Sequence, residues 1–103
     1  MKKILIIEDD QMLIKNLLLV LKSEERKLSL AIDGETGLAL AKTEKPDLIL
    51  LDLIIPKIDG FAVLEKLKNE KETKNIPVLI LSNLGQAEEI KRAMALGATD
   101  YMI

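Results

Sequence analysis

The chain contains no cysteine, no histidine and no tryptophan, and its only aromatic side chains are Phe61 and Tyr101. Without cysteine it can form no disulfide and offers no thiolate nucleophile or sulfur ligand. Without histidine it also lacks the commonest general base and the commonest metal ligand. Any metal bound by these residues must therefore be a hard cation held by oxygen atoms.

The chain also has little excess charge of either sign and no long apolar run. The formal net charge of the 103 residues is −2, which gives no basic footprint for nucleic acid or for an anionic membrane. The first apolar run, Ile4 to Ile7, ends at Glu8 and is too short for a signal-peptide core or a membrane span. We expect one soluble, cytoplasmic domain over residues 1–103 with an aliphatic core.

Short apolar runs alternate with amphipathic stretches along the whole chain. Apolar runs of this length, bounded by polar residues, predict buried strands of a parallel sheet. The expected strands are residues 3–7, 27–32, 47–51, 76–81 and 98–103, the second nearer an edge. The expected helices are residues 11–22 and 34–45, one after Asp59-Gly60, and one between Gly85 and a C′ glycine at Gly97. This alternation predicts an α/β fold, a doubly wound parallel sheet with helices on both faces.

The spacing of apolar residues also predicts which side of each helix faces the core. The expected inward residues are Leu13, Leu17, Val20 and Leu21 in the first helix, Leu38 and Ala41 in the second, Phe61, Leu64 and Leu67 in the third, and Ala87, Ile90 and Met94 in the fourth.

Acidic residues follow two of the expected buried strands. Asp52 closes the run Leu48 to Leu51, and Glu8-Asp9-Asp10 closes the first run. Because the functional crevice of a parallel sheet lies at the carboxyl ends of its strands, these carboxylates can converge. Carboxylates about 5 Å apart repel by roughly 3 kcal/mol per pair at an effective dielectric near 20, a repulsion that a divalent cation relieves. Mg²⁺ is the natural occupant and Mn²⁺ a plausible substitute.

A carboxylate can also act as a nucleophile toward phosphorus and form an aspartyl phosphate. Asp52 stands alone at its strand end and is the candidate nucleophile, whereas Glu8 and Asp9 form a pair suited to the metal. Asp10 is equally well explained as the cap of the following helix. Ser82, after the fourth strand, is either a turn former or a donor to a phosphoryl oxygen. Tyr101 is either an edge aromatic or part of a switch.

The segments ILIIEDD, LILLDLIIPKIDG, VLILSN and GATDYMI resemble, over the whole chain, the receiver domain of bacterial two-component response regulators. The resemblance implies a flavodoxin-like strand order 2-1-3-4-5 and a phosphoacceptor signalling domain, not an enzyme in the usual sense. It implies that Asp52 accepts a phosphoryl group, with Mg²⁺ held by Glu8, Asp9, Asp52 and the backbone carbonyl of Ile54. It further implies that Ser82 and Tyr101 rearrange on phosphorylation.

The resemblance also implies partners. Because the chain has no histidine, the phosphohistidine must come from a histidine kinase or phosphotransfer protein, and the first helix, with Met12 and Leu13, is the expected docking site. An effector domain or downstream protein would receive the output. The family's strand-five lysine and fifth helix would fall beyond Ile103, so we expect a C-terminally truncated receiver that exposes an apolar patch and self-associates.

Three other functions are compatible with parts of this pattern. A flavodoxin-type flavin carrier needs a phosphate-cradling loop after the first strand, where this chain has acids that would repel phosphate. A phosphatase of the haloacid-dehalogenase type has its nucleophile after the first strand in an Asp-x-Asp pattern, with a cap insertion that is missing here. A pseudo-receiver or assembly module would bind partners without phosphorylation, and whether Asp52 can be modified separates it from an active receiver.

Overall fold

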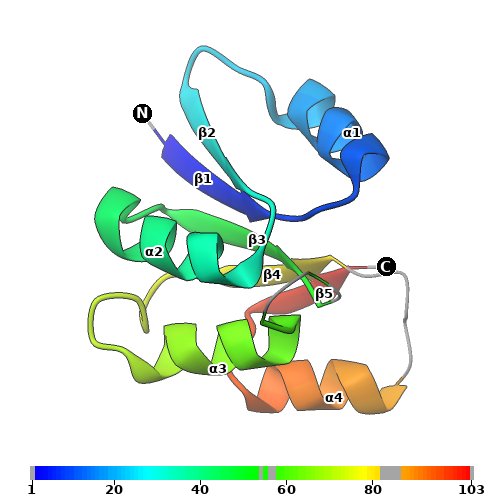
Figure 1. The fold of residues 1–103 in the computed structure, drawn as a ribbon, viewed down its shortest axis with the longest axis vertical. Helices are drawn as coiled ribbons and strands as arrows, with labels where there is room; N and C mark the ends of the chain where they lie inside the picture. Colours follow the sequence, from blue (N-terminus) through cyan, green and yellow to red (C-terminus); the bar gives the residue numbers. More distant parts are fainter. Residues whose placement is uncertain (1, 54, 56–57, 82–86, 103) are drawn as a thin grey trace.

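The computed structural model describes residues 2–53, 55, 58–81 and 87–102, in which strands and helices alternate (Figure 1). The strands are β1 Lys2–Ile7, β2 Arg26–Ala31, β3 Leu48–Asp52, β4 Val78–Leu81 and β5 Asp100–Met102. The helices are α1 Gln11–Leu21, α2 Gly34–Glu44, α3 Gly60–Asn69 and α4 Ala87–Ala95. No helix among the described residues has both the length and the apolar character that a membrane crossing requires.

The five strands form one parallel sheet in the order β2-β1-β3-β4-β5. Both the doubly wound α/β class and the 2-1-3-4-5 order expected from the resemblance are confirmed, and β2 is an edge strand as predicted. The strand limits differ slightly from expectation: β3 includes Asp52, and β4 and β5 each begin two residues later. Ile103 lies outside the described residues.

The two faces of the sheet carry unequal cores. Alternate β1 residues point to opposite faces, so Leu5 and Ile7 join the larger cluster while Ile4 and Ile6 join the smaller one. The larger cluster is formed with α2, α3 and α4, and the smaller one is covered by α1 (Figure 1). Helices therefore cover both faces, as predicted.

Two of the predicted helix faces need correction. Val20 was expected to face the core but is 77% exposed, and the buried residue of α1 is Ile14. In α4 the predicted inward residues Ala87 and Met94 are likewise exposed, and the buried residue is Ala93. In α1 nearly every position is apolar, so the pattern does not define one face. In α4 the small Ala93 allows the helix to approach the core closely, and the larger Met94 points away from it.

Three of the helices have an aspartate as their N-cap residue. Asp10, Asp33 and Asp59 are the N-caps of α1, α2 and α3, and each accepts backbone N–H bonds from the first turn. At the other end of α4, the predicted C′ glycine is confirmed, because Gly97 has a left-handed φ of 106°. Two reverse hydrogen bonds, Ala98 N–H to Ala93 O and Gly97 N–H to Met94 O, complete a Schellman motif.

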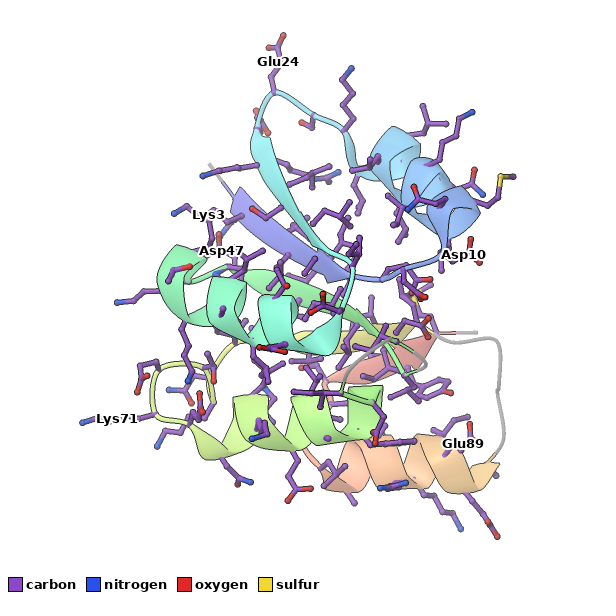
Figure 2. All side chains as sticks on the ribbon, viewed as in Figure 1. Lys3, Asp10, Glu24, Asp47, Lys71 and Glu89 are labelled. Carbon is purple, nitrogen blue, oxygen red and sulfur yellow. The ribbon has the colours of Figure 1, made fainter. Side chains whose placement is uncertain are left out.

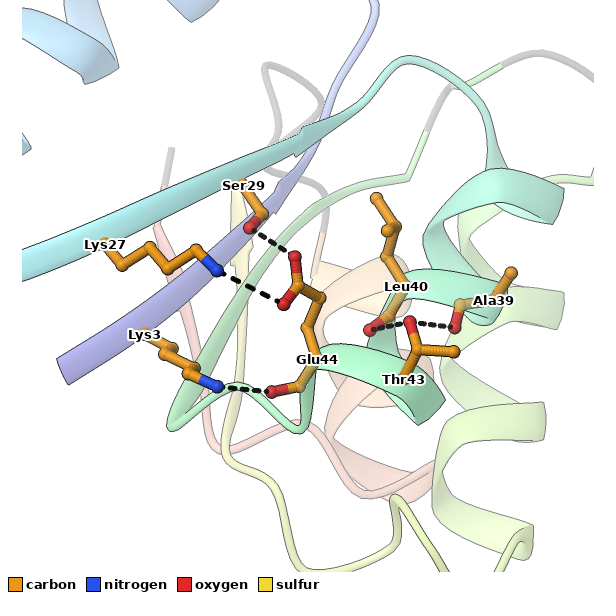
Figure 3. A network of polar contacts seen from close by, with 7 residues as sticks. All are labelled: Lys3, Lys27, Ser29, Ala39, Leu40, Thr43 and Glu44. Carbon is orange, nitrogen blue, oxygen red and sulfur yellow. Dashed lines mark hydrogen bonds and ion pairs between the residues drawn. The ribbon is translucent and has the colours of Figure 1, made fainter. Parts of the chain in front are cut away.

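Glu44, at the end of α2, ties that helix to the amino end of the sheet (Figure 3). Its carboxylate accepts a hydrogen bond from the Ser29 hydroxyl at 3.3 Å and pairs with the Lys27 ammonium at 3.5 Å. Its backbone carbonyl accepts a bond from the Lys3 ammonium at 3.3 Å. Both oxygens of this half-buried carboxylate therefore have partners, and all of the partners come from β1 and β2.

Candidate functional site

The register of β1 and β3 brings two acidic residues to the same edge of the sheet. Ile7 of β1 pairs with Leu51 of β3. The residues that follow them, Glu8 and Asp52, therefore lie side by side at the carboxyl ends of adjacent strands. The Glu8 N–H donates to Ala31 O at 2.9 Å, which fixes the backbone just beyond β1. The side chains are thus positioned by the most buried strands of the sheet.

Glu8, Asp9 and Asp52 form a cluster of three carboxylates. One oxygen from each residue lies within 4.8 Å of the other two. Glu8 is only 2% exposed, Asp52 is half-buried and Asp9 is exposed, so the cluster runs from the interior to the surface. The convergence predicted from the two strand ends is therefore confirmed as geometry.

Burial and the neighbouring Asp52 carboxyl raise the pKa of Glu8 from its ordinary value of 4.5 to about 8. Loss of hydration is the largest cause, because the ionised form loses the most on burial. A hydrogen bond to Asp52 and repulsion from its charge raise the pKa further, and the Asp10 N–H bond to Oε1 lowers it. Near neutral pH, Glu8 without a cation therefore holds a proton.

The residues present fit a divalent cation. Glu8 Oε2 is buried, and no N–H or O–H donor of the described residues bonds to it. The Glu8 carboxyl lies against the Asp52 carboxyl, so either a shared proton or a cation can relieve the repulsion between the two groups. Three carboxylate oxygens at this separation, with an exposed member that opens the cluster to solvent, are typical of Mg²⁺ ligands in proteins.

Gly60 supports the backbone beneath Asp52. A Cβ at this position would lie 2.5 Å from the Asp52 carbonyl oxygen and would collide with Leu53 Cα. The Gly60 N–H also donates to Leu53 O at 2.9 Å. The start of α3 therefore packs directly on the end of β3, a positioning role that sequence reasoning missed. The Asp59-Gly60 pair predicted a turn, but not what the glycine would touch.

The other predicted site residues are not members of this carboxylate cluster or lie outside the described residues. Asp10 caps α1, accepting from Met12 N–H at 2.9 Å and Leu13 N–H at 3.2 Å, which is the ordinary role considered for it. Tyr101 pairs with Ile80 in the edge strand β5 and is half-buried against the larger core. Its hydroxyl is buried with no hydrogen-bond partner among the described residues. Ile54 and Ser82 lie outside the described residues.

Comparison with known proteins identifies relatives of the whole chain. Residues 4–103 match the sequence model of the response regulator receiver domain family. The DNA-binding dual master transcriptional regulator RpaA of Synechocystis is 41% identical over 102 residues, which are 99% of this chain and 42% of that protein. The chain thus spans less than half the length of this curated relative.

Two solved structures resemble the fold closely. The phosphorylated cyanobacterial phytochrome response regulator RcpA is 31% identical, with a TM-score of 0.84 over 98% of this chain and 79% of that one. The CheX-CheY-BeF3-Mg²⁺ complex of Borrelia burgdorferi contains a chain 28% identical, with a TM-score of 0.91 over 99% of this chain and 77% of that one.

Proposed function

The chain belongs to the response regulator receiver domain family, and from that premise we propose that Asp52 accepts a phosphoryl group from a phosphohistidine. The observation that carries the proposal is the convergence of Asp52 with Glu8 and Asp9 at the carboxyl edge of the sheet. A domain of this kind acts as a signalling component and not as a classical enzyme. Its phosphotransfer chemistry would be limited to its own carboxylate.

In the proposed step an Asp52 carboxylate oxygen attacks the phosphorus of the donor. A P–O bond forms as the P–N bond to the histidine ring breaks, and the ring leaves with the electron pair and takes up a proton. The half-buried position of Asp52 leaves the side chain accessible to a donor, while β3 and Gly60 hold its backbone in place. The phosphorylated relative RcpA supports this assignment.

Glu8, Asp9 and Asp52 would hold the divalent cation, Mg²⁺ or Mn²⁺, together with the backbone carbonyl of Ile54 that the resemblance implies. When bound, the cation neutralises charge on the phosphoryl oxygens. Glu8 would bind the cation in its ionised form, so metal binding would release the proton that burial and Asp52 keep on it near neutral pH. Support comes from the relative whose complex contains Mg²⁺.

Ser82 and Tyr101 are the proposed switch pair. The Ser82 hydroxyl would donate to the phosphoryl group, and the Tyr101 ring would change position with it. The Tyr101 hydroxyl is buried and has no hydrogen-bond partner among the described residues, so within that part of the chain packing alone holds the ring.

The donor would be a histidine kinase or phosphotransfer protein of the same compartment, which we propose to be the cytoplasm. α1 is the proposed docking element, through Met12 and Leu13. Met12, Leu19 and Val20 are strongly exposed along α1, and exposed apolar side chains in such a row are typical of helix–helix contacts. An effector domain or a downstream protein would receive the output.

Intact-mass analysis with phosphoramidate and Mg²⁺ tests the proposal, because this donor also carries a P–N bond. We expect one phosphoryl group on the wild type and none on Asp52→Asn or in the presence of a chelator. Asp47→Asn, at the opposite end of the sheet, is the matched control and keeps the adduct. An adduct that persists in Asp52→Asn would contradict the assignment. No adduct on a folded wild type would favour the assembly module.

A further inference from the structure

A groove of about 380 Å³ lies between α1 and the edge strand β2. It is lined by Lys15, Leu18, Leu19, Lys22 and Leu28. Leu28 contributes from the strand and also packs against the smaller core cluster, so the floor of the groove is continuous with the protein interior. The groove is separate from the acidic cluster at the carboxyl end of the sheet.

The walls of the groove are apolar and incompletely covered. Leu18 is 37% exposed and Leu19 is 70% exposed. Lysine stems commonly lie over apolar surface and cover it while the ammonium stays in water. Here the two leucines remain accessible although lysines flank them, so the protein's own side chains do not cover the apolar surface of the groove.

The charges at the groove are all of one sign. Lys15 lies on α1 and Lys22 is its C-cap residue, seven positions later, a separation of about two helical turns or roughly 10 Å. Neither forms an ion pair with an acidic residue in the described part of the chain, in contrast to Lys27 and Lys42. An occupant would therefore meet an apolar floor between two uncompensated positive charges.

We propose that this groove docks an amphipathic helix of a partner protein, with leucine-like side chains on one face and carboxylates spaced to meet Lys15 and Lys22. Charge complementarity selects this occupant, since helices commonly bind apolar grooves in this way. A second copy of the chain is disfavoured, because self-pairing here would bring four ammonium groups together. The groove lies on the β2 side of α1. It shares Leu19 with the exposed apolar residues proposed to meet the phosphodonor, but not Met12 or Leu13, and the proposal does not depend on phosphorylation.

The test is an NMR titration of the isotope-labelled protein with two synthetic stapled helices. Both carry leucines along one face; one has glutamates seven positions apart and the other has lysines there. We expect the glutamate helix to bind at least about fivefold more tightly, since it gains two exposed ion pairs and avoids two repulsions. The shifted resonances should include Leu18, Leu19 and Leu28.

Charge reversal provides the control. The double variant Lys15→Glu, Lys22→Glu should invert the preference and bind the lysine helix. The double variant Lys71→Glu, Lys91→Glu has the same net charge but should keep the wild-type preference. Equal binding of both helices, shifts confined to another surface, no binding to the folded protein, or a dimer that contacts itself through this groove would each overturn the proposal.

Discussion

Glu8 and Glu44 are two shielded glutamates at opposite ends of the same sheet, and their surroundings differ. Lys3 and Asp47 mark the amino end of the sheet, and Asp10 lies near its carboxyl end (Figure 2). Glu44 accepts a bond from Lys3 at the first end, and Glu8 accepts one from the Asp10 N–H at the second. Both carboxylate oxygens of Glu44 have partners, from Ser29 and Lys27. Glu8 has one backbone donor and otherwise faces the Asp52 carboxyl.

The contrast separates a structural carboxylate from a functional one. An ionised Glu44 is stabilised by its cationic neighbour, so its charge favours the fold. An ionised Glu8 is destabilised by burial and by Asp52, so its charge opposes the fold until a cation arrives. Unfavourable charge at a site that the strands hold in place is typical of binding and catalytic positions.

The largest expected effect is on the pH dependence of stability. In a chelator, the free energy of unfolding of the wild type, compared with Glu8→Gln, should fall as pH rises from about 4.5 to about 8. The sign follows because the folded protein keeps a proton on Glu8 that the unfolded chain loses, so folding takes up a proton. The fall is at most about 5 kcal/mol, from 1.36 kcal/mol per pKa unit.

Urea denaturation over this pH range measures the difference in the free energy of unfolding between the two proteins, so the titration of groups that do not interact with Glu8 cancels. A constant difference across the range would contradict the account of Glu8. A difference that grows in favour of the wild type would mean that the Glu8 charge is stabilised in the folded protein.

The next largest effect should come from Asp52→Asn. Without metal at about pH 8, this variant should be more stable than the wild type by about 1–3 kcal/mol, because the charge that opposes Glu8 is gone and an amide can donate to it. Asp47→Asn is the matched control; it weakens the 2.8 Å bond from the Lys3 N–H and should destabilise. A destabilised Asp52→Asn would contradict the comparison.

The smallest effect should come from Glu44→Gln. Loss of the ion pair with Lys27, which is half exposed, should lower stability by about 0.5 kcal/mol near neutral pH. Thermal unfolding at low and high salt would measure it, and salt should shrink the difference because it screens the pair. A stabilised variant would mean that Glu44, like Glu8, carries an unfavourable charge.

Sequence reasoning predicted the part of the site that depends on local patterns. The apolar runs that end at Glu8 and Asp52 were enough to predict that these carboxylates converge, because parallel strands bring their carboxyl ends to one edge of the sheet. The partners of Glu44 could not be predicted, since they come from distant positions and depend on how α2 ends against β1 and β2. Contact between Gly60 and β3 is likewise a property of packing.

The helix faces show the limit of periodicity. α1 is apolar almost all round, so Val20 and Ile14 could not be distinguished by spacing. The same excess of apolar residues leaves leucines for the groove beside β2, which no motif indicated. Where the pattern was sparse, as in α3, the predicted inward residues Leu64 and Leu67 are indeed buried.

The most direct measurement of the central claim is thermal unfolding with and without Mg²⁺, in the wild type, in the double variant Glu8→Gln, Asp52→Asn, and in Glu44→Gln. The account predicts that Mg²⁺ stabilises the wild type and Glu44→Gln alike and leaves the double variant unchanged, because a ligand stabilises only the fold that binds it. Equal stabilisation of all three proteins, or none of the wild type, would contradict the claim that these carboxylates form a cation site.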